Sequence, residues 1–352
     1  MTTTDGTATT KRLQYIDAMR GVAILLIIYG HISLYCYGDY AEAVSFRPLT
    51  YLIQLPMFFF ISGYVMSRKP LSGGGIIKNL LKRARQLLIP AVVFGGIYIS
   101  VKGMDIVSCL CGTFKGGYWF TLVLFVFILV QTLTDCVAAR LRIRNDSVLY
   151  AATLLCLALF LYLWSIPAVC ARVEPVGGIL SMRTWQYYFY FAAGHLIRIH
   201  LGTLLRFKRR DTAVTVVVLL FVILGLGAWT QIGIPFGSGL LFHLRHIALV
   251  TTATLSVFFL FYRHRALFDT DSMAARAIAF TGRRTLDIYM LHYFLLPADL
   301  VVFGKYFDEH HALILELLFA GALTVAIAAA CLLISELLRS SKTIEHWLLC
   351  GR

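Results

Sequence analysis

Long apolar stretches, separated by short basic segments, restrict the fold of this chain more than any other feature. We place ten of them at roughly 20–38, 48–67, 87–102, 117–136, 147–168, 185–200, 212–230, 240–262, 285–304 and 312–337. A helix needs about 20 mostly apolar residues to cross the hydrocarbon core of a bilayer. The pattern therefore predicts an all-α, polytopic bundle of about ten transmembrane helices, in which the third and sixth segments are short.

The composition is that of a membrane protein rather than a soluble domain. Of the 352 residues, 59% are hydrophobic and 14% are charged, and the mean hydropathy is +0.78. A soluble domain has about half apolar and about a quarter charged residues. Residues 1–10 are polar and rich in threonine, which predicts a disordered tail. No linker or soluble segment divides the rest, so residues 11–352 are expected to form a single membrane domain.

The excess of positive charge indicates membrane orientation rather than nucleic-acid binding. The formal net charge is +14, and the basic residues cluster between the apolar stretches. If the amino terminus is cytoplasmic and ten helices alternate, 25 of the 32 lysines and arginines face the cytoplasm, as the positive-inside rule requires. We therefore expect a multi-pass protein of the inner or plasma membrane with both termini cytoplasmic. The sequence has no nucleic-acid motif, and its eight scattered cysteines predict no metal site.

Ionisable side chains within the apolar stretches are the first functional candidates, because they are costly in hydrocarbon. Arg20 and His31 are eleven positions apart, which places them within about 20° of one helix face and roughly 16 Å apart along its axis. Asp17 stands three residues before Arg20, a spacing that allows an ion pair on one face. His31 would then lie near or beyond the middle of the bilayer. It is either a functional group or a buried histidine that bonds a neighbouring helix.

Five short motifs follow one another along almost the whole chain. They occupy residues 15–23 with Gly30-His31, 55–64, 82–85 with Pro90, 118–120 and 285–292. In this order the motifs resemble those of the acyltransferase-3 family of integral membrane acyltransferases, whose opening signature is an arginine, ten residues and a histidine. Thr285 departs mildly from the last motif, where serine is commoner, but it keeps the hydroxyl group.

The resemblance implies an O-acetyltransferase-like enzyme that takes an acyl group, acetyl above all, from acyl-CoA on the cytoplasmic side. The acceptor would be a hydroxyl group of a surface polysaccharide or a lipid-linked sugar of the cell envelope, and no metal is implied. His31 would act as the general base, or would carry the acyl group itself. Arg20 would keep the region around the approach to His31 electropositive, or would contact the phosphates of the donor. The alternative is that Arg20 only pairs with Asp17. The oligomeric state stays open.

Three basic residues that follow the second apolar stretch are candidates for binding the donor. Lys82, Arg83 and Arg85 would grip the phosphates of coenzyme A, the arginines through paired hydrogen bonds. The alternative is that they only anchor the inner face of the protein, since every inner loop is basic. The motif resemblance places them in a basic inner loop at the entry to the third helix.

The remaining candidates come from the other motifs. One helix face, which begins near the cytoplasmic side, carries Thr285, Tyr289 and His292. We therefore expect Tyr289 and His292 to bind the acyl-CoA donor. Trp119 lies at the outer boundary, where it either belongs to an aromatic belt or stacks on the acceptor sugar. Ser62 is a second acceptor candidate in a stretch whose small residues otherwise indicate close helix packing.

Two rival interpretations belong to other classes of protein. A proton-coupled transporter or glycan exporter also uses intramembrane histidine, arginine and aspartate, although we find no inverted repeat or paired broken helices. A purely structural assembly subunit fits the topology and leaves Arg20 and His31 unexplained. For the acyltransferase we expect a cavity that reaches both membrane faces, with His195 and His200 at the inner interface and outside the site.

Overall fold

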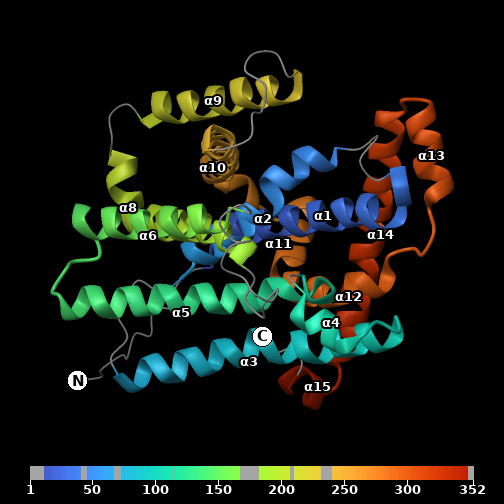
Figure 1. The fold of residues 1–352 in the computed structure, drawn as a ribbon, viewed down its shortest axis with the longest axis horizontal. Coiled ribbons are helices and arrows are strands. Elements are labelled where there is room, and N and C mark those ends of the chain that lie inside the picture. The colour runs from blue at the N-terminus through green and yellow to red at the C-terminus, as the bar shows by residue number, and fades with distance from the viewer. Residues whose placement is uncertain are drawn as a thin grey trace.

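The computed structural model describes residues 12–40, 46–66, 73–112, 114–166, 182–206, 210–230 and 240–347. Every regular element in these ranges is helical, which confirms the predicted all-α class (Figure 1). The first part contains α1 (Gln14–Cys36), η1 (Gly38–Tyr40), α2 (Arg47–Tyr64), α3 (Gly73–Val101), α4 (Ile106–Cys111), η2 (Lys115–Gly117), α5 (Trp119–Arg140) and α6 (Val148–Trp164). The second part contains η3 (Met182–Tyr187), α8 (Tyr188–Arg206), α9 (Arg210–Thr230), α10 (Leu240–Arg263), η4 (Arg265–Asp269), α11 (Met273–Arg283), α12 (Thr285–Leu295), α13 (Val301–Glu309), α14 (Leu313–Arg339) and α15 (Lys342–Trp347). The tail expected at residues 1–10 lies outside the described residues.

Five of the described helices, α1, α3, α5, α10 and α14, are long and apolar enough to cross a membrane. With 23 residues, α1 is about 35 Å long, against a hydrocarbon core of about 30 Å. Shorter apolar helices run over Leu49–Tyr64, Val148–Trp164 and Asp211–Val222. The chain is therefore a multi-pass membrane protein. The count of ten spans and the cytoplasmic termini stay predictions.

The first helix, α1, is at the centre of the bundle. It packs against α2, α10, α11, α12 and α14, and in Figure 1 it lies between α9 on one side and α3 on the other. Its core side chains are fully buried: Ala18, Met19, Ala23, Ile28 and Ile32 are all 0% exposed. A helix that is apolar all round its circumference is stable when neighbours cover it on every side. This packing carries the polar residues of α1 into the interior of the bundle.

The close contact of α2 with α8 depends on two glycines. A Cβ atom on Gly63 would lie 1.9 Å from the carbonyl oxygen of Phe191, and one on Gly194 would lie 2.0 Å from that of Phe60. Small residues let helix backbones approach each other in membranes. The close helix packing that the small residues around Ser62 indicated is thus confirmed at Gly63. The helix α2 continues past its internal proline.

The ninth apolar stretch, predicted as one span over 285–304, is two helices. The first, α12, ends at Leu295, and the second, α13, begins at Val301. Pro297 explains the break, because proline disfavours helical backbone in the residue before it. Leu296 is accordingly extended, with φ −64° and ψ 127°. At 11 residues, α12 is only about 16 Å long, about half the thickness of the hydrocarbon core.

The third helix begins earlier than predicted. The apolar stretch suggested 87–102, whereas α3 starts at Gly73 and continues through its internal proline to Val101. Lys82, Arg83 and Arg85 therefore lie on a helix and not in a loop. Lysine, arginine, leucine and glutamine all favour helix, so the polar segment extends the apolar one without interruption.

Two acids within apolar stretches hold helices together. Arg339 and Ser335 on α14 each donate to the same carboxylate oxygen of Asp287 on α12, at 2.7 Å. Near the start of α14, Glu316 is 0% exposed and accepts a 2.7 Å hydrogen bond from the Tyr29 hydroxyl of α1. Buried polar groups are retained when they are hydrogen-bonded. These contacts fix α12 and α14 beside α1.

Candidate active site

A cavity of about 1080 Å³ opens between α1, α2, α3, α5 and α12. It follows α1 from Arg20 to Tyr35, a distance of about 22 Å along the helix axis. Arg12, which also lines it, extends the cavity beyond the first turn of α1. Ligand pockets commonly measure about 300–1,000 Å³, so the cavity is at the upper end of the range for a ligand site.

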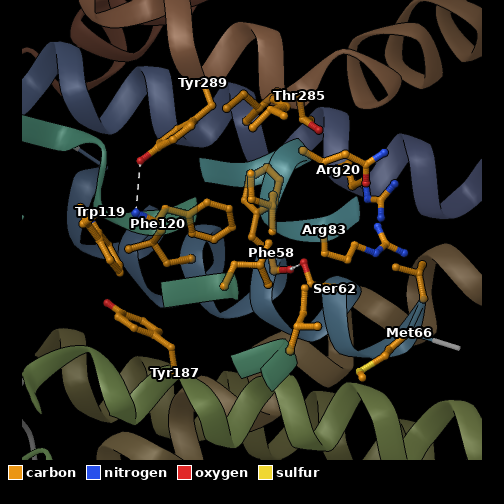
Figure 2. Close-up of a pocket in the computed structure, with 18 of the residues that line it drawn as sticks. Arg20, Phe58, Ser62, Met66, Arg83, Trp119, Phe120, Tyr187, Thr285 and Tyr289 are labelled. Atoms are coloured by element: carbon orange, nitrogen blue, oxygen red, sulfur yellow. Dashed lines mark hydrogen bonds between the residues drawn. The ribbon is translucent and has the colours of Figure 1, made fainter. Parts of the chain in front are cut away.

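One end of the cavity is cationic. Arg12, Arg20, Lys82, Arg83 and Arg140 line it, and Figure 2 shows the Arg20 and Arg83 side chains next to each other. Such a cluster suits a ligand with several phosphate groups, because guanidinium groups bind phosphate through paired hydrogen bonds.

Arg85 is separated from the other basic candidates, and Arg20 makes the ion pair that its spacing allows. Arg85 lies outside the lining of the cavity, unlike its neighbours Lys82 and Arg83. The predicted pairing of Arg20 with Asp17 is confirmed at 3.7 Å. Asp17 is almost fully buried and also binds Arg12, so one carboxylate holds two of the arginines at the cationic end of the cavity.

The opposite end of the cavity is aromatic. Trp119 is 8% exposed there, and its ring centroid lies 5.9 Å from that of Tyr187. Tyr187 in turn stacks on Phe59 at 5.2 Å. In Figure 2 Trp119 and Tyr187 face the cavity from the side away from Arg20 and Arg83. Aromatic faces of this kind suit an apolar or sugar-ring surface rather than an anion.

A tight turn holds Trp119 in place. The hydroxyl of Tyr289 donates to the carbonyl of Gly117 at 2.6 Å and accepts from the Phe120 amide at 3.3 Å. Gly117 has a φ of +103°, and a Cβ atom there would lie 2.5 Å from the ring of Tyr293. Tyr289 lines the cavity, but its hydroxyl is used to fix the start of α5, a role that its sequence motif did not suggest.

His31 and His292 form a direct pair in the middle of the bundle. The Nδ1 atom of His31 lies 2.9 Å from Nε2 of His292, and the two rings are nearly parallel at 12°. His31 lines the cavity, whereas His292 is 0% exposed behind it. Tyr293 and Tyr35 flank the His31 ring at centroid distances of 5.0 and 5.3 Å. The sequence motifs indicated both histidines as site residues, but the predicted role of His292 was to bind the acyl-CoA donor rather than to contact His31.

The hydrogen bonds of His292 determine which nitrogen of His31 is basic. Nδ1 of His292 lies 3.1 Å from the carbonyl oxygen of Ile288 and 2.9 Å from that of Tyr289. Carbonyl oxygens only accept, so this nitrogen carries the proton, and a neutral ring leaves Nε2 as an acceptor. His31 must then donate through Nδ1, which leaves its Nε2 as the basic nitrogen.

The two hydroxyl candidates lie on the wall of the cavity. Ser62 lines it from α2, and its Oγ donates to the carbonyl of Phe58 at 2.8 Å within the same helix. Thr285 lines it from the first turn of α12 and donates to the Gly282 carbonyl at 3.2 Å. Both hydroxyls keep lone pairs that can accept a hydrogen bond.

A second polar cluster differs from what the sequence predicted. His195, expected at the interface, is 2% exposed and lies 3.2 Å from the hydroxyl of Tyr150. That hydroxyl donates to Asp135 at 2.5 Å, and Gln131 donates to the same carboxylate at 2.9 Å. The expectation for His195 is wrong because α6 and α5 cover this face of α8. Asp135 also lines the cavity. The sequence analysis missed this residue, although a carboxylate within an apolar stretch could have identified it.

These features define a class of protein: a membrane-embedded helical bundle with a polar, histidine-containing cavity that is cationic at one end and aromatic at the other. The model of the acyltransferase-3 family, described as an acyltransferase domain, matches residues 13–335. The chain belongs to this family and is a membrane acyltransferase. No curated protein and no solved structure matches it.

Proposed function

We propose that the protein moves an acetyl or related acyl group from acyl-CoA to a hydroxyl group of a surface polysaccharide or lipid-linked sugar. The observation that carries the proposal is the His31–His292 pair, of which His31 lines the cavity that is cationic at one end and aromatic at the other. His31 acts as the general base. His292 accepts the hydrogen bond from Nδ1 of His31 and thereby keeps Nε2 of His31 basic.

The chemistry is a single displacement at the thioester carbonyl. The acceptor hydroxyl gives its proton to Nε2 of His31 as its oxygen bonds to the carbonyl carbon. The carbonyl electron pair moves to oxygen and returns as the carbon–sulfur bond breaks. The coenzyme A thiolate leaves with the proton from the His31 imidazolium. Neutral imidazole suits both proton transfers near neutral pH.

The two ends of the cavity support the assignment of substrates. Lys82, Arg83 and Arg20 would hold the phosphates of coenzyme A, with the pantetheine arm extending toward His31. Trp119 and Tyr187 would stack on the acceptor sugar at the other end. An enclosed site also protects the thioester from water.

A glycan or solute exporter is the rival function that a cavity of this length supports. An exporter would move its ligand past His31 without consuming a thioester. Thiol release from acetyl-CoA therefore separates the two functions, since only the acyltransferase produces free coenzyme A.

The test uses purified protein in lipid nanodiscs with acetyl-CoA, and follows thiol release with and without a glycan extract of the host membrane. We expect His31→Ala to lower the rate by about 10²–10⁴-fold, the usual contribution of a general base. His264→Ala, a change at an exposed histidine outside the cavity, is the matched control. A His31→Ala rate within threefold of wild type would refute the proposal.

The same preparation distinguishes a base from an acyl carrier. Protein incubated with radiolabelled acetyl-CoA without acceptor is denatured rapidly and its bound label counted. Direct transfer predicts no label on the chain. Label that disappears in His31→Ala would instead make His31 the carrier.

A further inference from the structure

Asp135 on α5 is a carboxylate at the cationic end of the cavity, yet it pairs with none of the cations there. It lines the cavity, as does Arg140 less than two turns further along the same helix. Sixteen residues separate it from Trp119 at the aromatic end, a distance of about 24 Å along the helix axis. Within the described ranges, its only ion-pair contact is with His195, at 4.0 Å. An unpaired acid in an apolar helix is costly and is a functional candidate by default.

Buried side chains hold one oxygen of this carboxylate. The Tyr150 hydroxyl and the Gln131 amide donate to Oδ1 at 2.5 and 2.9 Å. The amide oxygen of Gln131 in turn accepts from the Tyr188 hydroxyl at 3.2 Å, so the donors are themselves fixed. These three side chains are 0–2% exposed, and none of them lines the cavity. The contacts to Oδ1 therefore come from behind the cavity wall.

The second oxygen is left for a ligand. Among the described residues, Oδ2 of Asp135 has no hydrogen-bond partner, since the contacts of this carboxylate all go to Oδ1. It is not one of the fully buried side-chain atoms without a partner, and the side chain is 17% exposed where it lines the cavity. An ionised carboxylate only accepts hydrogen bonds. The ligand group that meets Oδ2 must therefore be a donor.

Coenzyme A has few hydrogen-bond donors in the part that a cationic site would hold. Its phosphates are acceptors and would be repelled by a carboxylate, and its free ribose hydroxyl lies beside the 3′-phosphate. The exocyclic amine of adenine is the donor furthest from the phosphates. Apolar side chains that could cover the faces of the base also line the cavity, among them Met66 and Ile76. Figure 2 shows Met66 on the same side of the cavity as Arg20 and Arg83.

We infer that Asp135 recognises the adenine base of the acyl donor, by accepting a hydrogen bond from its exocyclic amine at Oδ2. The inference rests on the proposed function and adds a specificity-determining residue to the donor site. Tyr150 and Gln131 are positioning residues, because they hold Oδ1 and so fix the direction of Oδ2. The arginines bind the phosphates through charge, whereas Asp135 distinguishes the base.

The experiment compares coenzyme A with 1,N6-etheno-coenzyme A, in which an added ring removes the hydrogens of the amine. Calorimetry on wild-type protein in nanodiscs should show the etheno derivative binding about tenfold or more weakly, the usual effect of a hydrogen bond to a charged group. In Asp135→Asn the amide presents a donor where the carboxylate accepted, so the ratio of the two Kd values should fall below threefold. If the etheno ring is only too large for the site, the variant will reject it as strongly as wild type does, which would overturn the assignment.

Glu316→Gln is the matched control. Glu316 is also a buried carboxylate that accepts from a tyrosine, with 2.7 Å to the Tyr29 hydroxyl, but it lies outside the cavity lining. The change removes the same charge and should leave the ratio of Kd values within twofold of wild type. Loss of discrimination in both Glu316→Gln and Asp135→Asn would overturn the assignment. A purely structural Asp135 predicts a lower Tm in Asp135→Asn with an unchanged ratio.

A second variant tests the positioning without touching the ligand-binding oxygen. Tyr150→Phe removes one of the two hydrogen bonds to Oδ1, and discrimination should fall at least threefold, because small misplacements in a site are costly. If Asp135→Asn does not fold, Tyr150→Phe decides alone: wild-type discrimination refutes the inference. If wild-type protein binds no coenzyme A, the proposed function fails. If it binds coenzyme A and the etheno derivative equally, only this inference fails.

Discussion

At the scale of the residue, the basicity of His31 depends on a partner 261 positions away in the chain. His292 is fixed by two backbone carbonyls of its own helix. Its remaining nitrogen can only accept, so the pair has one arrangement of protons when both rings are neutral. The protein thereby keeps Nε2 of His31 as the basic nitrogen without using a carboxylate, which would be costly in this apolar region.

Loss of His292 should leave acyl-CoA binding intact but should make Nε2 of His31 a poorer base. In His292→Leu, the Nδ1 atom of His31 loses its acceptor and the ring populates the other tautomer. We expect kcat to fall by about tenfold or more, with the KM for acetyl-CoA unchanged. The thiol-release assay measures both constants, and His264→Leu is the control. A normal kcat would show that His292 only packs against His31.

The sequence predicted individual residues better than it predicted their contacts. Arg20 and His31 could be placed on one helix face because the period of a helix is constant. The contact of His31 with His292 depends on how α12 packs against α1, which no local pattern encodes.

At the scale of the element, Lys82, Arg83 and Arg85 are distinguished by the face of α3 on which they lie. Residues on a helix point about 100° apart from one to the next, so neighbours in sequence need not share a ligand. Lys82 and Arg83 line the cavity, and Arg85 does not. In a loop, the three residues would have been equivalent.

This difference gives a prediction for donor binding. Charged hydrogen bonds contribute about 1.5–3 kcal/mol each, so Lys82→Gln with Arg83→Gln should weaken coenzyme A binding by about tenfold or more. The loss should shrink in high salt, which screens exposed charges. Arg85→Gln should bind within threefold of wild type. Calorimetry with coenzyme A decides, and equal losses from Arg83 and Arg85 would contradict the assignment.

The crossing of α2 and α8 can be tested on one helix. In Gly194→Ala the new methyl group meets the carbonyl of Phe60, and we expect the free energy of unfolding to fall by about 1–3 kcal/mol. At Gly202 on the same helix, an added methyl group would have no atom within 4 Å. Gly202→Ala should therefore be neutral or stabilising by about 0.5–1 kcal/mol. Thermal unfolding in one detergent compares the two, and equal stability would contradict this account of the contact.

At the scale of the whole molecule, the cavity joins what the sequence presented as separate motifs. The family motifs of α1, α2, α3, α5 and α12 all contribute to its lining. The apolar pattern predicted the helical class and most helix positions, because it is repeated over many residues. It did not predict that proline would divide the ninth stretch, or that α11 would pack as a separate helix against α1. Those outcomes depend on backbone restriction and tertiary contact.

The orientation of the bundle is the last prediction. The distribution of basic residues predicts that the cationic end of the cavity faces the cytoplasm, where acyl-CoA would be available, and that α4 lies on the outside. Cys111 on α4 is exposed, and Cys136 lines the cavity near Arg140. An impermeant thiol reagent on intact cells should label Cys111 at once, and Cys136 only after permeabilisation. Cys111→Ser confirms the assignment by removing the first signal. Labelling of Cys136 before permeabilisation, with Cys111 protected, would reverse the orientation and put the cationic end of the cavity on the side that lacks the donor.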